Sequence, residues 1–440
     1  MSGDAKSQSE FVLSEVRPLN SDPVDVVIAA GKIREICAPG TGAARNPIAQ
    51  VIPGAGQVLL PGLVDLHTHL REPGREDAET VHTGSQAAAL GGFTAVHAMA
   101  NTDPVMDTAG VAIQVWRLGR EAGYVDVRPV GAVTVGLEGQ RMAELGAMAD
   151  SAARVRVFSD DGKCVSDPVR MRRALEYVKV FDGVIAQHAQ EPRLTEGAQM
   201  NEGVMSARLG LKGWPSVAEE AIIARDILLA ELVDSRLHIC HVSTAGSVDI
   251  IRRAKQRGIK VTAEVTPHHL LLTDDLAVGY DPVYKVNPPL RTAADVVAVR
   301  EGLADGTIDI VATDHAPHAS EDKDCEWDYA AFGMLGLPTA LSVVAQSMVT
   351  TQALDWAGVA DRLSTSPARI GQVQDQGQPL AVGEPANLAV VDPDQTWVVN
   401  AADFPGPSHN SPYNGMKLPA KVTATFFRGR ATVIDGELQW

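Results

Sequence analysis

Short apolar runs alternate with longer amphipathic stretches through most of the chain. The apolar runs are nearly continuous, which is typical of strands buried on both faces of a parallel sheet. The first begins at Val58, and the others are predicted at 93–99, 125–133, 155–158, 184–188, 236–241, 260–265 and 309–313. Helices are predicted at 80–90, 110–122, 142–149, 168–181, 216–233, 246–257, 295–304, 338–347 and 351–363. These β/α repeats predict an α/β fold, a TIM-type (β/α)8 barrel, with an open doubly wound sheet as the alternative.

The two ends of the chain have a different pattern. A hairpin is predicted over 25–36 with its turn at Gly31 and Lys32, and a further short strand at 50–53. The helical pattern stops after Pro367, and strands are predicted at 385–392, 420–427 and 431–438. We expect both ends to pair in a composite β-sandwich that flanks the barrel. The predicted units are 1–57 (tail and first sandwich strands), 58–370 (barrel) and 371–440 (remaining sandwich strands).

The composition of the chain argues against several classes of function and partner. The 440 residues are 45% hydrophobic, which is ordinary for a globular chain, and the net charge of -17 argues against a nucleic acid or an anionic membrane as partner. No apolar run reaches the roughly 18 residues that a membrane-spanning helix needs, and residues 1–10 lack the apolar core of a signal peptide. The scattered cysteines predict no disulfide framework and a cytoplasmic location. They are Cys37, Cys164, Cys240 and Cys325.

Polar side chains gather where the predicted strands end. They are His67, His69, Asn101, Asp161, His188, His241, Asn287 and Asp314. In a barrel these strand ends converge on one mouth, whereas an open sheet would spread them along a line. His67 and His69 stand two apart on a strand, so both imidazoles face the same side and can reach one divalent cation. Imidazole ligands suit zinc.

The candidate ligands are sufficient for two cations that share a carboxylate. Paired metal ions in hydrolases lie roughly 3.5–4 Å apart. Each residue alone has an ordinary explanation: His188 as a core histidine, or Asp161 as part of an Asp-Asp-Gly turn. Their joint occurrence at successive strand ends favours the metal site.

Several stretches resemble the amidohydrolase superfamily and, within it, dihydroorotase of class I, which is related to hydantoinases and allantoinases. Asp65–Arg71 carries the first resemblance. The other matching stretches are 69–74, 158–162, 285–291, 313–318 and 410–415, which together span most of the chain. Hydantoinases and most allantoinases carry a carboxylated lysine as bridging ligand. Class I dihydroorotases have the Asp-Asp-Gly turn there, so the resemblance makes Asp161 the bridge and leaves Lys163 on the surface.

The resemblance also implies the roles of the site residues. His67, His69, Asp161 and Asp314 would bind the first metal ion, and His188, His241 and Asp161 the second, giving one or two Zn2+ per chain bridged by Asp161. Arg71, Asn101 and Asn287, with His318 beside them, would contact the carboxylate and amide of the substrate. A guanidinium fork suits a carboxylate. Gly333 would offer a backbone group to the substrate ring.

The implied activity is a zinc-dependent, reversible interconversion of N-carbamoyl-L-aspartate and L-dihydroorotate in de novo pyrimidine biosynthesis. Asp314 would be the catalytic residue that carries a proton from the attacking hydroxide to the leaving ring nitrogen. Another cyclic amidase (a hydantoinase or an allantoinase) is one alternative, which Arg71 and Asn101 disfavour. A non-catalytic partner of aspartate carbamoyltransferase is the other, which the complete ligand set disfavours. Expected partners are the small-molecule substrate and further copies of the chain, and docking to aspartate carbamoyltransferase stays open.

Overall fold

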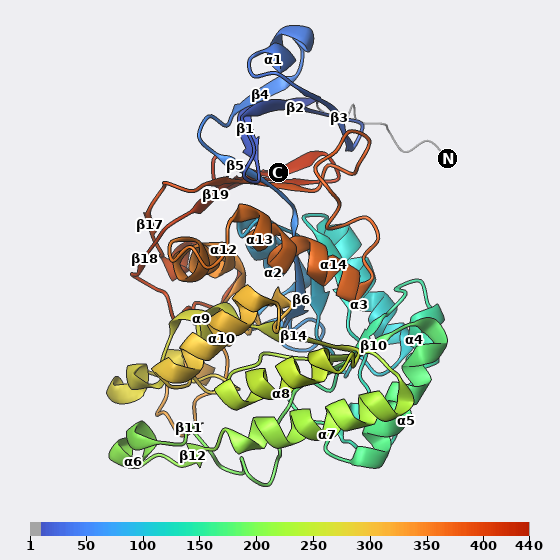
Figure 1. Cartoon of the computed structure of the whole chain (residues 1–440), viewed down its shortest axis with the longest axis vertical. Coiled ribbons are helices and arrows are strands. Elements are labelled where there is room, and N and C mark those ends of the chain that lie inside the picture. Colours follow the sequence, from blue (N-terminus) through green and yellow to red (C-terminus); the bar gives the residue numbers. More distant parts are fainter. Residues whose placement is uncertain (1–9, 440) are drawn as a thin grey trace.

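The computed structural model describes residues 10–439 and has two β layers, one wrapped by helices and one at the end of the molecule (Figure 1). The helix-wrapped layer consists of parallel strands, as the continuous apolar runs predicted. They are β6 (Leu63–Thr68), β7 (Phe93–Ala98), β8 (Asp126–Pro129), β9 (Val157–Phe158), β10 (Val184–Gln187), β13 (Leu237–Ile239), β14 (Val261–Val265) and β15 (Ile310–Val311). The α/β class predicted from the sequence is therefore confirmed.

The parallel strands form two hydrogen-bonded groups. One has the order β6-β7-β8 and the other β15-β14-β13-β10-β9. Two isolated parallel bridges lie between the groups: Gly131 with Phe158 at the β8/β9 side, and Thr68 with His315 at the β6/β15 side. All the strands run in one direction, so the loops that follow them lie on the same side of the layer.

Helices connect the strands and cover their outer side (Figure 1). The longer ones are α2 (Val81–Leu90), α3 (Ala109–Ala122), α5 (Pro168–Val178), α7 (Val217–Val233), α8 (Ala245–Gln256) and α10 (Ala293–Asp305). Shorter ones are α1 (Thr41–Arg45), α4 (Leu145–Asp150), α6 (Val204–Leu209), α9 (Pro267–Leu271), α11 (Ser320–Lys323), α12 (Ala340–Val344), α13 (Trp356–Ala360) and α14 (Ser366–Gly371). Buried aliphatic residues from the helices and strands form one continuous core.

The last helical segment is longer than predicted. A π-helical stretch, Asp361–Thr365, joins α13 to α14, so helix continues past Pro367 to Gly371. Pro367 is the second residue of α14, which comes directly after the π-helical stretch, where the helix widens. The expectation that the helical pattern stops at Pro367 was therefore wrong.

Both ends of the chain meet in a nine-stranded sheet, as expected. Its members are β1 (Phe11–Pro18), β2 (Val24–Ala29), β3 (Lys32–Cys37), β4 (Gln50–Pro53), β5 (Val58–Pro61), β16 (Leu388–Asp392), β19 (Lys421–Phe427), β20 (Arg430–Ile434) and β21 (Glu437–Leu438). The order is β21-β20-β19-β16-β5-β1-β2-β3, with β4 beside β1. The antiparallel pair β5–β16 joins the two ends. β1, the strand that both β4 and β5 contact, was not among the predicted strands.

The apolar run that begins at Val58 is two strands rather than one. β5 belongs to the nine-stranded sheet, called the terminal sheet below, and β6 belongs to the parallel strands. Gly62 lies between them. A Cβ on Gly62 would lie 2.2 Å from Thr94 Oγ1, so only glycine fits where the chain passes from one sheet to the other. Two small pairs complete the strands: β11 (Met200–Asn201) with β12 (Gly213–Trp214), and β17 (Trp397–Val398) with β18 (Lys417–Leu418). Within residues 10–439 no helix has the length and apolarity to cross a bilayer.

Candidate metal centre

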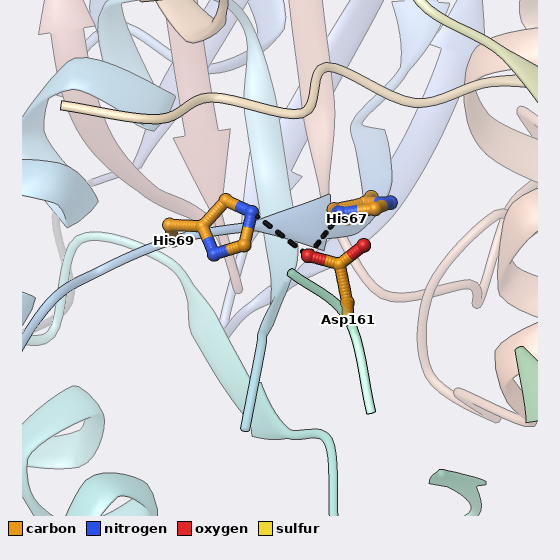
Figure 2. Close-up of side chains that lie close together, drawn as sticks. All are labelled: His67, His69 and Asp161. Atoms are coloured by element: carbon orange, nitrogen blue, oxygen red, sulfur yellow. Dashed lines mark ion pairs between the residues drawn. The ribbon is translucent and has the colours of Figure 1, made fainter. Parts of the chain in front are cut away.

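Two histidines and one aspartate form the first half of the site (Figure 2). His67 is on β6, His69 follows this strand, and Asp161 follows β9. Asp161 Oδ2 lies 3.3 Å from His67 Nε2 and 3.2 Å from His69 Nε2. The three side chains are buried, and their ligand atoms lie within 4.8 Å of one another, close enough to hold one metal ion.

The other oxygen of Asp161 faces a second pair of histidines. Oδ1 lies 3.0 Å from Nδ1 of His188, which follows β10, and 3.3 Å from Nε2 of His241, which follows β13. The two imidazole nitrogens are 2.9 Å apart. This is a second group able to hold an ion. One carboxylate thus lies between two ligand groups, each facing a different oxygen atom.

Asp314, which follows β15, closes the first group. Its Oδ1 lies 3.1 Å from His69 Nε2 and 3.5 Å from His67 Nε2. Asp314 (φ 47°), His241 (φ 32°) and Arg71 (φ 61°) all have left-handed backbone, which is costly for residues with a Cβ. Backbone of this kind persists only where the surroundings impose it, and here it occurs at three of the predicted site residues.

Buried carboxylates hold the strand ends in place. Asp65 on β6 accepts hydrogen bonds from Thr313 N (2.9 Å) and Thr68 Oγ1 (2.7 Å), which ties β6 to the chain that carries Asp314. Asp160 accepts from the backbone N–H groups of Val133 (2.8 Å) and Thr134 (2.9 Å), which fixes the turn that presents Asp161. These contacts orient the predicted ligands.

Glu264 on β14 is a site residue that the sequence analysis missed. Its Oε1 lies 2.6 Å from His67 Nδ1 and also accepts from the backbone N–H of His241, while its Oε2 lies 2.9 Å from His238 Nε2. The carboxylate accepts the Nδ1 proton of His67, which leaves Nε2 as the ligand atom. The available sequence signal was that Glu264 is the only charged residue in Val261–Val265.

The electrostatics of the site favour a cation. Burial opposes a charge on His67, but the carboxylates of Asp161 and Glu264 raise its pKa well above 6.5. Burial would raise the pKa of Asp161, but His67 and the hydrogen bond with His188 hold it well below its ordinary value. Three carboxylates around His67 therefore create a strongly negative pocket that attracts protons and metal ions alike.

Three of the predicted substrate-contact residues, Arg71, Asn101 and His318, lie beside the first ligand group. Arg71 Nε donates to Pro317 O (3.0 Å), and its Nη2 lies 3.4 Å from His318 Nε2. Burial lowers the pKa of Arg71 to about 10, so it keeps its charge at neutral pH. Asn101 Oδ1 accepts the Nδ1 proton of His69 (2.8 Å), so Asn101 orients a predicted metal ligand as well.

Asn287 is joined to the second ligand group through Gln190, a second residue that the sequence analysis missed. Gln190 Oε1 lies 2.7 Å from His188 Nε2 and accepts from Asn287 Nδ2 at 3.1 Å. Asn287 Oδ1 is buried and has no hydrogen-bond partner among the described residues. That acceptor is available for an N–H group of a bound molecule. The only sequence signal for Gln190 was its position two residues after His188.

Gly333 lies against His318, and a Cβ there would be 2.6 Å from His318 Nε2. Both of its backbone groups have partners in the chain: its N–H donates to Lys285 O (3.0 Å) and its carbonyl accepts from Asn410 Nδ2 (3.2 Å). Asn410 Oδ1 accepts from the His318 N–H at 3.2 Å. The matched stretch 410–415 thus reaches the site from the C-terminal part of the chain. Lys163 is exposed, as predicted.

Comparison with known proteins supports one family. The family model described as dihydro-orotase-like matches residues 56–247. A dihydroorotase of Streptomyces coelicolor is 66% identical over 430 residues, which cover 98% of this chain and 100% of the relative. A dihydroorotase of Mycobacterium tuberculosis is 58% identical over 425 residues, covering 96% of this chain and 98% of the relative.

Solved structures agree on the fold. The L-hydantoinase (dihydropyrimidinase) of Arthrobacter aurescens has a TM-score of 0.86 at 24% identity and covers 98% of this chain and 97% of its own. The dihydropyrimidinase of Brevibacillus agri has a TM-score of 0.83 at 22% identity, with 98% and 96% covered. Sequence similarity over nearly the whole length of the chain, together with the fold, leads to one assignment: the chain belongs to the dihydroorotase family.

Proposed function

We propose that this chain is a zinc-dependent dihydroorotase, which interconverts L-dihydroorotate and N-carbamoyl-L-aspartate in de novo pyrimidine biosynthesis. The observation that carries the proposal is the position of Asp161 between two pairs of histidines. The chain presents this arrangement while being 58–66% identical to proteins named dihydroorotase over nearly its full length.

The donor set fits metal ions. His67 Nε2 is buried among carboxylates and has no hydrogen-bond partner in the described part of the chain, so a cation would satisfy it. We infer one or two Zn2+, the first held by His67, His69, Asp161 and Asp314, the second by Asp161, His188 and His241. When bound, such ions polarise a carbonyl and lower the pKa of water.

The substrate would lie between Arg71 and Asn287. The Arg71 guanidinium carries a charge suited to the substrate carboxylate, and His318 and Pro317 hold it in place. Asn101, oriented by His69, would add an amide contact to that carboxylate, and Asn287 Oδ1 would accept from a ring N–H. Gly333 would border the ring beside His318. These contacts would present the scissile amide to the ligand groups in one orientation.

Asp314 would move the proton. Burial alone would raise its pKa, but the adjacent His67 and His69 lower it to about 2, so Asp314 is an anion at neutral pH. In hydrolysis the water oxygen bonds to the ring carbonyl carbon and the C–N bond breaks. Asp314 accepts the proton of the water and passes it to the ring nitrogen, and cyclisation reverses these steps. An Asp314→Asn variant should keep its fold and lose turnover by about 100-fold or more.

We also propose that the parallel strands close into a (β/α)8 barrel flanked by a β-sandwich. The bridges at Gly131–Phe158 and Thr68–His315 support closure, because they connect the two strand groups at both sides. A shared apolar cluster from the two chain ends, including Phe11 packed on Phe426, supports the sandwich. The proposed units are 1–57, 58–370 and 371–440, with strand β5 at the first boundary contributing to the sandwich.

Substrate assays would separate this function from its rivals. Purified protein with a measured zinc content should hydrolyse dihydroorotate and leave hydantoin and allantoin unchanged. Turnover of hydantoin or allantoin in preference to dihydroorotate would make it another cyclic amidase. A chain that binds no zinc and turns over none of the three would be a non-catalytic member of the family. The ligand groups around Asp161 favour the catalytic outcome.

We also propose a cellular location and two kinds of association. The four cysteines are free thiols, which supports a cytoplasmic location. Assembly into homo-oligomers and docking to aspartate carbamoyltransferase rest on the family resemblance alone. Size-exclusion chromatography with light scattering tests the first, and co-elution with the carbamoyltransferase tests the second.

A further inference from the structure

A cavity of about 500 Å³ lies at the opposite end of the parallel strands from the metal centre. Arg156, which lines it, directly precedes β9, whereas Asp161 follows the same strand. Arg128 on β8 and Arg154 in the turn before β9 line the cavity as well. Three arginines thus converge on one cavity in a chain whose net charge is -17.

Internal ion pairs balance only one of these three charges. Arg128 Nη2 lies 2.6 Å from an oxygen of Asp126 and 3.5 Å from one of Asp375, which Arg428 also binds at 2.7 Å. Neither Arg154 nor Arg156 has a carboxylate within 4 Å among residues 10–439. Two guanidinium charges therefore remain without an acidic partner on the cavity wall.

Arg156 is held in place although it lacks an acidic partner. Its Nη1 donates to Ala149 O and to Val155 O, each at 2.9 Å. Burial and the charge of Arg154 lower its pKa, against the weaker attraction of Asp150 and Asp182. Holding two like charges together in this way costs free energy, and an anion placed between them would remove that cost.

The remaining lining indicates the size and class of the ligand. The ring of Phe181 and the side chains of Gln372, Gln374 and Asp375 complete the wall. The Asp375 carboxylate is already paired with Arg128 and Arg428. The two glutamines also line an adjoining cavity of about 450 Å³. These volumes suit a small molecule, and guanidinium forks bind phosphate oxygens in pairs. We propose that this cavity binds a small-molecule phosphate ester, with Arg154 and Arg156 as anchors for its phosphate group.

Calorimetric titration of the metal-loaded enzyme would test the site. The probes are inorganic phosphate and phenyl phosphate, whose ring can contact Phe181, both at low ionic strength. The test variant is Arg154→Gln with Arg156→Gln. The control is Arg172→Gln with Arg173→Gln, which removes the same charge from an exposed part of α5. Any binding of phosphate at the metal centre is common to all three proteins, so it cancels in the comparison.

We expect both probes to bind the wild-type and control proteins about tenfold or more tightly than the double variant, because each guanidinium contributes charge-assisted hydrogen bonds. Phenyl phosphate should bind more tightly than phosphate. Equal affinity of the double variant and the wild type would overturn the proposal, as would no binding by the wild type. If the double variant fails to fold, Arg154→Gln alone serves, because Arg154 is exposed.

Discussion

The orientation of the His67 ring depends on Glu264, a residue that belongs to neither ligand group. His67 Nε2 faces Asp161 and Asp314, and Glu264 at 2.6 Å holds Nδ1 from the other side of the ring. A carboxylate on the distal nitrogen fixes the tautomer and makes the imidazole a stronger ligand. Glu264 lies 197 positions along the chain from His67, so this pairing exists only once the strands are assembled.

A Glu264→Gln variant should therefore bind zinc about 10- to 100-fold more weakly. Affinity is measured by competition with a chromophoric chelator, and turnover should recover when zinc is added in excess. Glu301→Gln, on an exposed position of α10, is the matched control. Unchanged zinc affinity in the Glu264 variant would mean that the contact with His67 is structural only.

One side-chain oxygen of Gln190 contacts both a predicted metal ligand and a predicted substrate-contact residue. Its Oε1 lies 2.7 Å from His188 Nε2 and 3.1 Å from Asn287 Nδ2. Gln190→Ala should raise the KM for dihydroorotate about 2- to 10-fold, the effect of one lost hydrogen bond, with a smaller change in kcat. Gln190→Glu keeps the acceptor and should recover most of the affinity. Steady-state kinetics of the three proteins test this, and an unchanged KM in Gln190→Ala would refute the positioning role.

At the scale of elements, the passage from β5 to β6 depends on Gly62. A methyl group there would lie 2.2 Å from Thr94 Oγ1 and 2.4 Å from its Cγ2, and Thr94 is fully buried. Gly62→Ala should lower the free energy of unfolding by about 1–3 kcal/mol. Urea denaturation measures it, with Gly279→Ala as the control because nothing lies within 4 Å there. Adding Thr94→Ala should cost less than the two single effects combined, and strict additivity would show that the clash is not the cause.

The elements were predictable where the pattern was local and strong. Continuous apolar runs predicted the parallel strands, and side chains at their ends predicted which residues meet around Asp161. β1 was missed because Ser14, Glu15 and Arg17 interrupt its apolar residues, so its sequence lacks the continuous apolar run of a buried strand. The break at Gly62 was missed because the apolar run continues through it. Glu264 was missed because its partner His67 lies 197 positions away in the sequence. Gln190 was missed because its position two residues after His188 does not indicate that its side chain contacts both His188 and Asn287.

A buried carboxylate joins α7 to β10 and makes their packing dependent on pH. Asp226 accepts from Gln187 Nε2 and Arg225 Nε, each at 2.7 Å, and burial raises its pKa to about 6 although Arg225 opposes this. The unfolded chain loses this proton near the ordinary value of 3.8, so the folded state binds more protons between about pH 4 and 6. The stability contributed by protonated Asp226 is therefore complete below about pH 4 and is lost as the pH rises towards 6.

An Asp226→Asn variant removes this titration. Relative to the variant, the wild type should lose about 3 kcal/mol of unfolding free energy between pH 4 and pH 7. Urea denaturation at several pH values gives the difference directly. Asp150→Asn, an exposed position, should show no such trend. A wild-type-to-variant difference that stays constant, or grows in the opposite direction, would contradict the raised pKa.

At the scale of the whole molecule, the terminal sheet and the helix-wrapped strands share a core. Val58, Ala389 and Val422 from the sheet belong to the same apolar cluster as the helices and parallel strands. A second cluster on the sheet joins the two chain ends, where the rings of Phe11 and Phe426 pack edge to face with centroids 5.2 Å apart. Because the first cluster is continuous, the sheet should not unfold separately from the site.

Phe426→Ala tests that continuity. The change removes a fully buried ring from a cluster that contains none of the predicted site residues, and it should cost about 3–5 kcal/mol. Far-UV ellipticity and dihydroorotate turnover should then be lost at the same, lower urea concentration, since loss of the sheet exposes the core beneath the site. Val398→Ala, at a position 54% exposed, should leave both midpoints within error. If ellipticity falls in a separate early step while turnover persists, the sheet is an independent unit, and the site depends on the parallel strands alone.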